Sequence, residues 1–386
     1  MRVVRLSFLL ALALAGAVCA QAPAPAPAAA TVYTPPQEPA WETRKPEQVG
    51  MSSEALSGAF EFAVDNATPW PTDLRQMLAE SVEAGPEGEI TGPTKPRGSV
   101  NGLVIRNGYI VWEHGDTRRV DMTFSATKSY VSTTVGLALD RGLIRDVNDP
   151  MRDYIKDGAF DSPHNAQITW HHMLQQTNEW EGTLFGKTDK ADRRLGRERE
   201  LKTPGMLYEY NDVRVNRTSL SSMQVWRRPL PDVLKELVMD PIGASSTWEW
   251  HGYSNSDVVI DGRTMKSVGG GGHWGGGLWI NSRDHARFGL LFLRRGRWGD
   301  RQLISEKWID MATTPGSVNP VYGYMWWLNT NRKLWPSAPE KSFAALGGNL
   351  NAVWISPEHD LVAVIRWIDN RQLDGFLARV LAAITK

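Results

Sequence analysis

The chain has 386 residues, with 43 basic and 43 acidic side chains and a formal net charge of zero. Its lysines and arginines are dispersed and it has no acidic tail, so composition argues against a nucleic-acid-binding protein. Hydrophobic residues make up 41% of the chain, which is typical of a soluble globular protein with one large or two coupled domains.

Residues 1–20 have the pattern of a secretory signal peptide: two arginines, an apolar run and a small-residue site at Ala20. The run is short for a membrane span, and no later stretch is long enough for one, so we expect a periplasmic or secreted protein. Lipid attachment at Cys19 is less favoured, because Val18 before it is bulky for such processing. Cleavage after Ala20 would also remove the single cysteine of the chain. An Ala/Pro-rich tether is expected over 21–45.

Strands are expected near both ends of the remaining chain, 46–386. The strongest hairpin signal is Asn107-Gly108 between two β-branched and aromatic runs. The expected strands are 100–106, 109–114, 278–280, 351–355 and 361–367. The expected helices are 52–64, 74–82, 125–139, 170–176, 229–237, 282–295 and 374–384. The pattern predicts an α+β fold in which 46–120 and 265–386 build an antiparallel sheet around an inserted, mainly helical region, 121–264. Within it, 146–262 is expected to be mostly helical or irregular.

The segment Ser125-Ala126-Thr127-Lys128 places a hydroxyl and an amine one helical turn apart at the start of a predicted helix. A neutral Lys128 amine could take the Ser125 proton, and the helix N-terminus favours the negative charge of an acyl-transfer intermediate. Ser-x-x-Lys alone is weak, since it should occur about once by chance in such a chain. A serine N-cap followed by an exposed lysine is the structural alternative.

Further segments favour the catalytic interpretation of Ser125 and Lys128 over the structural one. A Pro-Gly turn at 204–205 precedes Tyr210-Asn211-Asp212, and a glycine-rich strand with Gly347-Gly348 lies near the C-terminus. In this order, these features resemble the serine β-lactamase and penicillin-binding-protein superfamily. The chain is most similar to its class C β-lactamase-like group, which includes family VIII carboxylesterases and 6-aminohexanoate-dimer hydrolase. The resemblance covers about 46–386 and implies a β-lactamase/transpeptidase-like fold, with helices on both faces of the sheet.

By this resemblance Ser125 is the nucleophile, Lys128 its activating partner and Tyr210 the group that moves a proton to and from the leaving atom. A tyrosine can act as a base only if nearby positive charge lowers its pKa, and we expect Lys128 to supply that charge. Which of the two is the general base stays open. Tyr208, two residues earlier, is expected to pack inward.

Two departures from the family pattern bear on substrate. Asp212 stands where β-lactam-recognising members commonly carry asparagine, and a carboxylate there should raise the pKa of Lys128. The family's Lys-Thr-Gly aligns with Leu346-Gly347-Gly348, so the lysine that pairs with a substrate carboxylate is missing. Backbone N–H groups of Ser125 and Asn349 would form the oxyanion hole.

The sequence therefore predicts a cofactor-free serine hydrolase of small neutral or differently charged esters or amides, of undetermined oligomeric state. A β-lactamase or D-amino-acid carboxypeptidase remains possible if an arginine such as Arg214 or Arg366 replaces the lysine, as does a non-catalytic cell-wall-binding relic. His273 is a candidate substrate contact. Tryptophans that could line the cleft or fill the core are Trp170, Trp180, Trp274, Trp326 and Trp327.

No metal is expected, because the adjacent pair His171-His172 lacks ligand spacing and is better explained as structural. The Gly-x-Gly-x-x-Gly within 269–277 follows no clear strand and does not indicate a dinucleotide site.

Overall fold

The computed structural model describes residues 33–82 and 85–385, within a compact unit that spans Val32–Lys386. The predicted signal peptide, Cys19 and the Ala/Pro alternation lie outside the described residues. None of the helices in the described ranges is long and apolar enough to cross a membrane. The tether was expected to reach residue 45, but Tyr33 stacks on Tyr109 at 4.1 Å and Trp41 is only 4% exposed. These aromatic side chains bury apolar area against the domain, so 33–45 belong to it.

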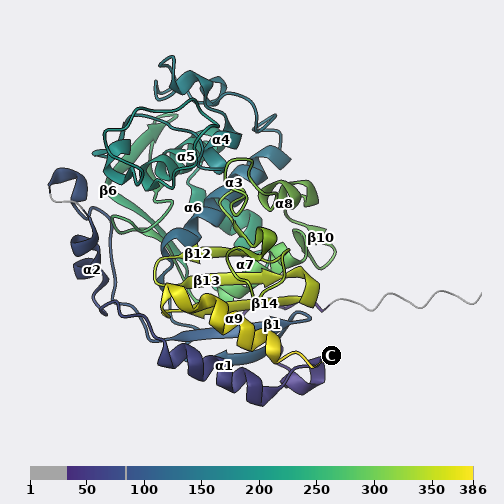
Figure 1. The fold of residues 1–386 in the computed structure, drawn as a ribbon. Coiled ribbons are helices and arrows are strands. Elements are labelled where there is room, and N and C mark those ends of the chain that lie inside the picture. Colours follow the sequence, from purple (N-terminus) through teal and green to yellow (C-terminus); the bar gives the residue numbers. More distant parts are fainter. Residues whose placement is uncertain (1–32, 83–84, 386) are drawn as a thin grey trace, which may run out of the picture. The chain divides into compact units, whose positions relative to one another are not determined.

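The larger sheet has six antiparallel strands drawn from both ends of the chain (Figure 1). Its order is β11 (Trp327–Leu328), β12 (Phe343–Gly347), β13 (Asn351–Ser356), β14 (Leu361–Arg366), β1 (Asn101–Arg106) and β2 (Tyr109–His114). The predicted hairpin is confirmed: Asn107 and Gly108 connect β1 to β2 with φ of 54° and 87°, the positive values that a tight hairpin turn requires.

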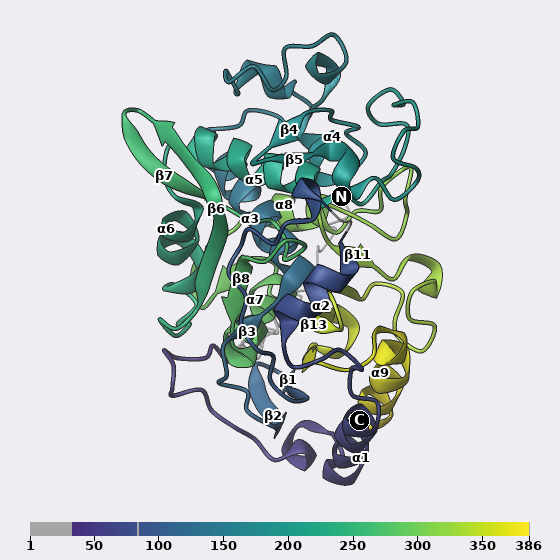
Figure 2. The same ribbon diagram turned by 90° about the vertical axis from the view of Figure 1, so that its left-hand side faces the viewer.

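Helices cover both faces of this sheet, as predicted. Side chains alternate along each strand, so Val104 of β1 joins one hydrophobic cluster and Leu103 joins the other. Helices α1 (Ser53–Asp65) and α9 (Leu373–Ala382) lie side by side on the first face (Figures 1 and 2). Helix α7 (Ser282–Leu293) packs on the second face, against β1, β13 and β14.

A second antiparallel sheet has the order β3 (Asp121–Met122), β8 (Gly277–Ile280), β6 (Glu249–Ile260) and β7 (Arg263–Val268). The β6–β7 hairpin is prominent in Figure 2. The expectation that 146–262 is mostly helical or irregular is wrong at its C-terminal end, where β6 lies. The run from Gly252 to Asp257 is rich in turn-forming residues, but here it forms a bulge within the β6–β7 pairing.

The remaining helices lie in the inserted region and beside it. They are α2 (Leu74–Ser81), α3 (Thr127–Asp140), α4 (Trp170–Leu174), α5 (Asp212–Trp226), α6 (Leu230–Leu234), which continues as a π-helical segment (Lys235–Met239), and α8 (Glu306–Ala312). Two short hairpins complete the described chain: β4 (Thr183–Leu184) with β5 (Lys187–Thr188), and β9 (Arg297–Trp298) with β10 (Arg301–Gln302).

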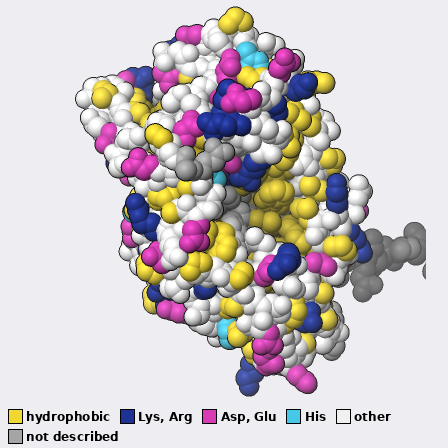
Figure 3. Space-filling view, turned by 60° about the vertical axis from the view of Figure 1, so that its left-hand side comes forward, with side chains coloured by type: hydrophobic (Ala, Val, Ile, Leu, Met, Phe, Trp, Pro, Cys, Tyr) yellow, Lys and Arg dark blue, Asp and Glu magenta, His cyan; other side chains and the backbone are white. Residues whose placement is uncertain are grey.

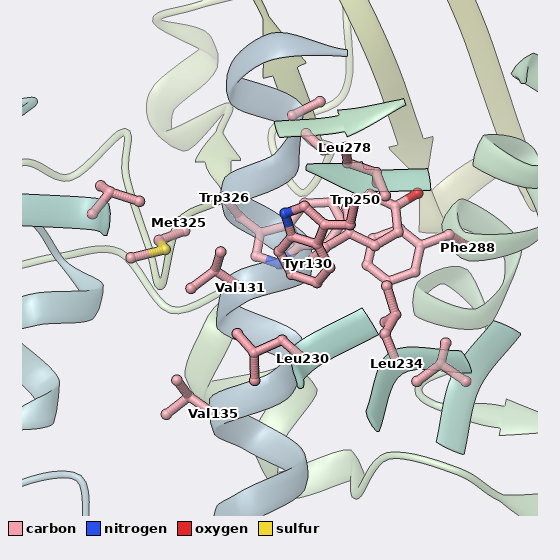
Figure 4. Close-up of a cluster of buried hydrophobic side chains, with 14 of the residues drawn as sticks. Tyr130, Val131, Val135, Leu230, Leu234, Trp250, Leu278, Phe288, Met325 and Trp326 are labelled. Carbon is pink, nitrogen blue, oxygen red and sulfur yellow. The ribbon is translucent and has the colours of Figure 1, made fainter. Parts of the chain in front are cut away.

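Helix α3 is buried along nearly its whole length. Tyr130 on α3 stacks on Phe288 of α7 at 3.8 Å, in a cluster that also contains Trp250, Leu278 and Trp326 (Figure 4). Burial of each such large side chain contributes on the order of 2–3 kcal/mol to stability. The first turn of α3 is therefore held rigidly by the core behind it.

Candidate active site

Ser125 lies in the 3-10 turn Phe124–Ala126 that leads directly into α3, and Lys128 lies in the first turn of that helix. The Lys128 Nζ donates a hydrogen bond to the Ser125 Oγ at 2.9 Å. Ser125 is half-buried and lines a cleft, whereas the Lys128 side chain is 1% exposed. The arrangement therefore presents a hydroxyl to the cleft and an amine behind it, which is not the exposed lysine of the structural alternative.

The backbone that carries Ser125 is strained. Phe124 has φ of 48°, a left-handed conformation that costs a residue other than glycine about 1–3 kcal/mol. Its ring packs edge-on against Trp70, with centroids 5.4 Å apart, and Gly272 lies so close that a Cβ there would be 2.8 Å from the Phe124 Cδ1. Packing on both sides thus holds a conformation that the isolated turn would not favour.

Asp212 is the partner of Lys128. It is the first residue of α5, whose N-cap is Asn211, and its Oδ1 accepts a very short hydrogen bond from the Lys128 amine. Burial opposes the charge of Lys128, but the Asp212 carboxylate outweighs burial and raises the pKa of the amine. Burial likewise opposes the charge of Asp212, yet Lys128 holds the pKa of that carboxyl below its usual range. The pairing thus favours the charged form of Lys128.

Tyr210 contacts both Ser125 and Lys128. The Lys128 Nζ lies 4.6 Å from the centroid of the Tyr210 ring, and the phenol interacts with both the Ser125 hydroxyl and the Lys128 amine. Burial raises the pKa of Tyr210 above its usual value, Asp212 raises it further, and Lys128 only partly opposes them. Lys128 thus acts on this pKa in the expected direction, but burial, which is the largest effect, and the Asp212 carboxylate together outweigh it.

Tyr208 packs edge-on against Tyr322, with ring centroids 5.3 Å apart, and is absent from the described lining of the cleft. Although it lies only two residues from Tyr210, it makes no hydrogen bond to Ser125 or Lys128 in the described chain. It is a natural control for Tyr210.

The cleft has a volume of about 470 Å³ and mainly apolar walls. Figure 3 shows such a hollow, with hydrophobic side chains on its walls and basic side chains near its margin. Among the tryptophans singled out in the sequence, Trp327 lines the cleft, whereas the other four are at most 2% exposed and belong to the core. Trp70 and Trp335, which also line it, come from loops without a periodic pattern that would have predicted their position.

Gly347 and Gly348 lie at the end of β12 and line the cleft beside Ser125. A Cβ at Gly347 would be 2.0 Å from the carbonyl oxygen of Thr123, so glycine is required where the strand meets the turn before Ser125. The next residue, Asn349, has φ of 41°, and its side-chain oxygen accepts a 2.6 Å hydrogen bond from Thr68. Within the described chain, neither the Ser125 N–H nor the Asn349 N–H donates a hydrogen bond.

His273 and a second carboxylate, Asp192, stand beside Asp212. The His273 Nδ1 lies 3.7 Å from Asp212 Oδ2, and Asp192 Oδ2 accepts the Asp212 N–H at 2.7 Å. Ligand atoms of the three residues lie within 4.8 Å of one another, a spacing that could hold a metal ion. Asp212 already pairs with Lys128 and Asp192 with Arg194, so a metal ion would have to displace these cations from the two carboxylates. The three residues therefore fit a metal ion poorly.

Arg194 was not singled out by the sequence, yet it lines the cleft with 48% of its side chain exposed. Arg214 and Arg366, the two arginines considered as replacements for the missing strand lysine, are both buried. Arg214 pairs with Glu179, Glu209 and Asp189, and Arg366 binds backbone carbonyls, so neither faces the cleft.

The histidine pair and the glycine run 269–277 have structural roles. His171 shares a 2.6 Å hydrogen bond with the Tyr324 hydroxyl, while the His172 ring accepts the Thr169 N–H at 3.3 Å. The glycine run 269–277 does follow a strand, β7, contrary to expectation, but it leads into strand β8. It therefore lacks the strand–turn–helix context of a dinucleotide site.

Comparison with known proteins agrees with this geometry. The beta-lactamase family model matches residues 95–377. The 6-aminohexanoate-dimer hydrolase of Paenarthrobacter ureafaciens is 23% identical over 316 residues, covering 74% of this chain and 77% of that protein. The chain belongs to the beta-lactamase family, whose members are β-lactamase-fold hydrolases.

Solved structures show the same fold at low identity. A family VIII carboxylesterase has a TM-score of 0.55 and 17% identity, with 74% of this chain and 91% of that chain covered. EstCE1, described as a hydrolase with promiscuous acyltransferase activity, has a TM-score of 0.56 and 12% identity, with 86% and 98% covered. The predicted β-lactamase/transpeptidase-like fold is thereby confirmed.

Proposed function

We propose that this protein is a serine hydrolase that cleaves esters or amides through an acyl-enzyme on Ser125. The observation that carries the proposal is the hydrogen bond between the cleft-facing Ser125 hydroxyl and a buried lysine that also contacts Tyr210. A nucleophile, a proton-transfer group and an open cleft in this arrangement are what acyl transfer needs. A protein that only binds ligand has no physical need for all three.

In the proposed reaction the Ser125 Oγ attacks the substrate carbonyl carbon, and the hydroxyl proton passes to the Lys128–Tyr210 pair. The bond from the carbonyl carbon to the leaving oxygen or nitrogen then breaks, and the leaving atom takes a proton from Tyr210. Water then adds to the acyl carbon and gives a proton to Tyr210. The bond from the acyl carbon to Ser125 Oγ breaks, Tyr210 passes that proton to the Ser125 oxygen, and the acid is released.

We assign the general-base role to Tyr210. Asp212 raises the pKa of Lys128, so the Lys128 amine keeps its proton. When Lys128 and Tyr210 together lose one proton, that proton therefore comes from the Tyr210 phenol. The charged amine next to the ring stabilises the phenolate that results. Because the pKa of Tyr210 is raised as well, activity should increase as pH rises above neutrality.

The N–H groups of Ser125 and Asn349 are the proposed oxyanion hole. Both belong to backbone that packing holds in unusual conformations, at Phe124 before Ser125 and at Asn349 itself. Neither N–H donates a hydrogen bond within the described chain, so both are available to bind an oxyanion. Stabilising an oxyanion requires such N–H groups to be oriented before the reaction begins.

The substrate is proposed to be an ester or amide other than a β-lactam. Leu346 occupies the strand position that aligns with the family's lysine, and it adds an apolar side chain to the cleft wall. Three tryptophans, Trp70, Trp327 and Trp335, line the same space, which suits an apolar acyl or leaving group. Secretion or export to the periplasm, predicted from residues 1–20, is part of the same proposal.

The test incubates the protein in parallel with p-nitrophenyl butyrate, a chromogenic cephalosporin and a fluorophosphonate. We expect rapid ester turnover, little cephalosporin reaction and stoichiometric fluorophosphonate labelling, all lost in Ser125→Ala. Ser57→Ala, a change on α1 away from the cleft lining, is the matched control and should behave as wild type. Absence of labelling and turnover in the folded wild-type protein would overturn the proposal and favour a binding role.

A further inference from the structure

Arg194 occupies an unusual place in the cleft. The described charged residues of the lining are Asp212, which is buried and paired with Lys128, and Arg194, which is about half exposed. The Arg194 guanidinium lies over the Tyr210 ring, 4.7 Å from its centroid. A cation is thus fixed beside the proposed proton-transfer group in a cleft with mainly apolar walls.

One edge of this guanidinium is occupied. The Arg194 Nε donates to Asp192 Oδ1 at 3.0 Å, and Nη2 donates to Asp192 Oδ2 at 3.3 Å. Asp192 is itself anchored to the start of α5 through the Asp212 N–H. The two-point contact fixes the plane of the guanidinium, so less rotamer entropy is lost when a ligand binds its other edge.

The second edge, formed by Nη1 and the other N–H of Nη2, makes no hydrogen bond within the described chain. Nη1 donates no hydrogen bond to any residue in 33–82 or 85–385, and the nearest other carboxylate oxygen, Asp212 Oδ2, is 4.0 Å from Nη2. Guanidinium N–H pairs in this arrangement match the two oxygens of a carboxylate. Burial opposes the charge of Arg194, but Asp192 and Asp212 outweigh it and raise its pKa, so the cation persists throughout the working pH range.

We propose that Arg194 is a specificity-determining residue that binds a carboxylate on the substrate, so that the preferred substrates are carboxylate-bearing esters or amides. This inference rests on the proposed hydrolase function of the same cleft. The position differs from that of the family's strand lysine, because residue 346 is leucine and Arg194 reaches the cleft from the loop between β5 and α5.

The test compares two esters of equal acyl length, mono-p-nitrophenyl glutarate, which carries a carboxylate, and neutral p-nitrophenyl valerate. A second pair, 4-acetoxybenzoate and phenyl acetate, places the carboxylate on the leaving group. In the wild type we expect kcat/KM for the anionic member of at least one pair to exceed that of its neutral partner by about 10- to 100-fold. High salt should reduce this preference.

Arg194→Gln should bring the preferred ratio to about one, and Arg194→Lys should retain only part of it, because an ammonium lacks the planar two-point edge. Arg152→Gln, a change at an exposed arginine outside the cleft lining, should keep the wild-type ratio. No anionic preference in either pair, or a preference that survives in Arg194→Gln, would overturn the inference.

A binding measurement separates this inference from the proposed function. Both glutarate and valerate esters are titrated into Ser125→Ala, with quenching of the cleft tryptophans as the signal. Tighter binding of the anionic ester that is lost in Ser125→Ala/Arg194→Gln would support the carboxylate site even if turnover is absent. Equal binding of the two esters, together with Ser125-dependent turnover of both, would reject the carboxylate site and leave the hydrolase proposal intact.

Discussion

Two buried ion clusters stand near the start of α5, and they differ in what surrounds them. In the first, Arg199 and Arg214 are enclosed by Glu179 and Glu209, and both of these carboxylates are fully buried. In the second, Lys128 pairs with Asp212, but the amine also bonds to a half-exposed hydroxyl and contacts a phenol at the cleft.

The two clusters differ in whether the buried charges pair only with one another or also contact groups at the cleft. Cations and carboxylates of the Glu179 cluster satisfy one another, and its members are absent from the described lining of the cleft. The Lys128–Asp212 pair shares its protons with groups that substrate can reach, and the strained Phe124 lies next to it. Buried charge with a reachable hydroxyl indicates catalysis, whereas fully matched buried charge indicates architecture.

The largest expected effect is that of Lys128→Ala. We expect kcat/KM to fall by about 10³- to 10⁴-fold, because the variant removes both the partner of Ser125 and the charge that stabilises a Tyr210 phenolate. Steady-state ester hydrolysis checks this, with circular dichroism to confirm folding. Adding Ser125→Ala should cost little more, since the residues act as one unit. A folded Lys128→Ala that keeps wild-type rates would place Lys128 with the structural charges.

Tyr210→Phe should lower kcat by about 10²- to 10⁴-fold, the range typical of lost general acid–base catalysis. Tyr208→Phe removes the same hydroxyl two residues away, against Tyr322, and should change kcat by less than about threefold. Equal effects of the two changes would contradict the assignment of proton transfer to Tyr210.

Glu179→Gln tests the structural cluster. Loss of this carboxylate leaves Arg214 with a weaker set of partners and should lower the free energy of unfolding by about 3–5 kcal/mol, while kcat changes little. Denaturant unfolding measures the first and ester turnover the second. A large loss of kcat in the folded variant would show that this cluster also supports catalysis.

The same residue predicts an acid dependence. Burial opposes the Glu179 charge, but Arg199, the Lys202 N–H and Arg214 outweigh it and lower the pKa to about 2. The unfolded value is about 4.3, so the stabilisation is complete above that pH and is lost as pH falls toward about 2. Wild type should lose stability across this window more steeply than Glu179→Gln; parallel curves would contradict the assignment.

Asp212→Asn should act mainly on the pH dependence of the rate. Asp212 raises the pKa of both Lys128 and Tyr210, so its neutralisation should move the rising limb of the kcat/KM profile toward lower pH. The stability cost should be about 1–3 kcal/mol, because the amide oxygen can still accept from Lys128. An unchanged pH profile would show that the carboxylate charge does not tune the pair.

Much of this site could be predicted because it depends on local spacing. Ser125 and Lys128 are one helical turn apart, and Gly347 and Gly348 end a strand with a clear β pattern. The sequence and the family resemblance together therefore predict that the two segments lie close together. The antiparallel sheet was predictable for the same reason, since the Asn107-Gly108 turn and the alternating strands are local signals.

The remainder depends on long-range packing. Arg194 and Asp192 lie in a loop without hydrophobic periodicity, and only the folded chain shows that this loop reaches Tyr210. The raised pKa of Tyr210 also escaped prediction, because burial and Asp212 together outweigh the lowering effect of Lys128. Strand β6 was missed because its bulge is composed of residues that usually form turns.

The most direct test of the central claim is rapid-quench mass spectrometry of the intact protein during turnover of p-nitrophenyl butyrate. We expect a transient mass increase of one butyryl group, mapped by proteolysis to the peptide that contains Ser125, and its absence in Ser125→Ala. Turnover with no adduct on Ser125, or with the acyl group on another residue, would contradict an acyl-enzyme at this serine.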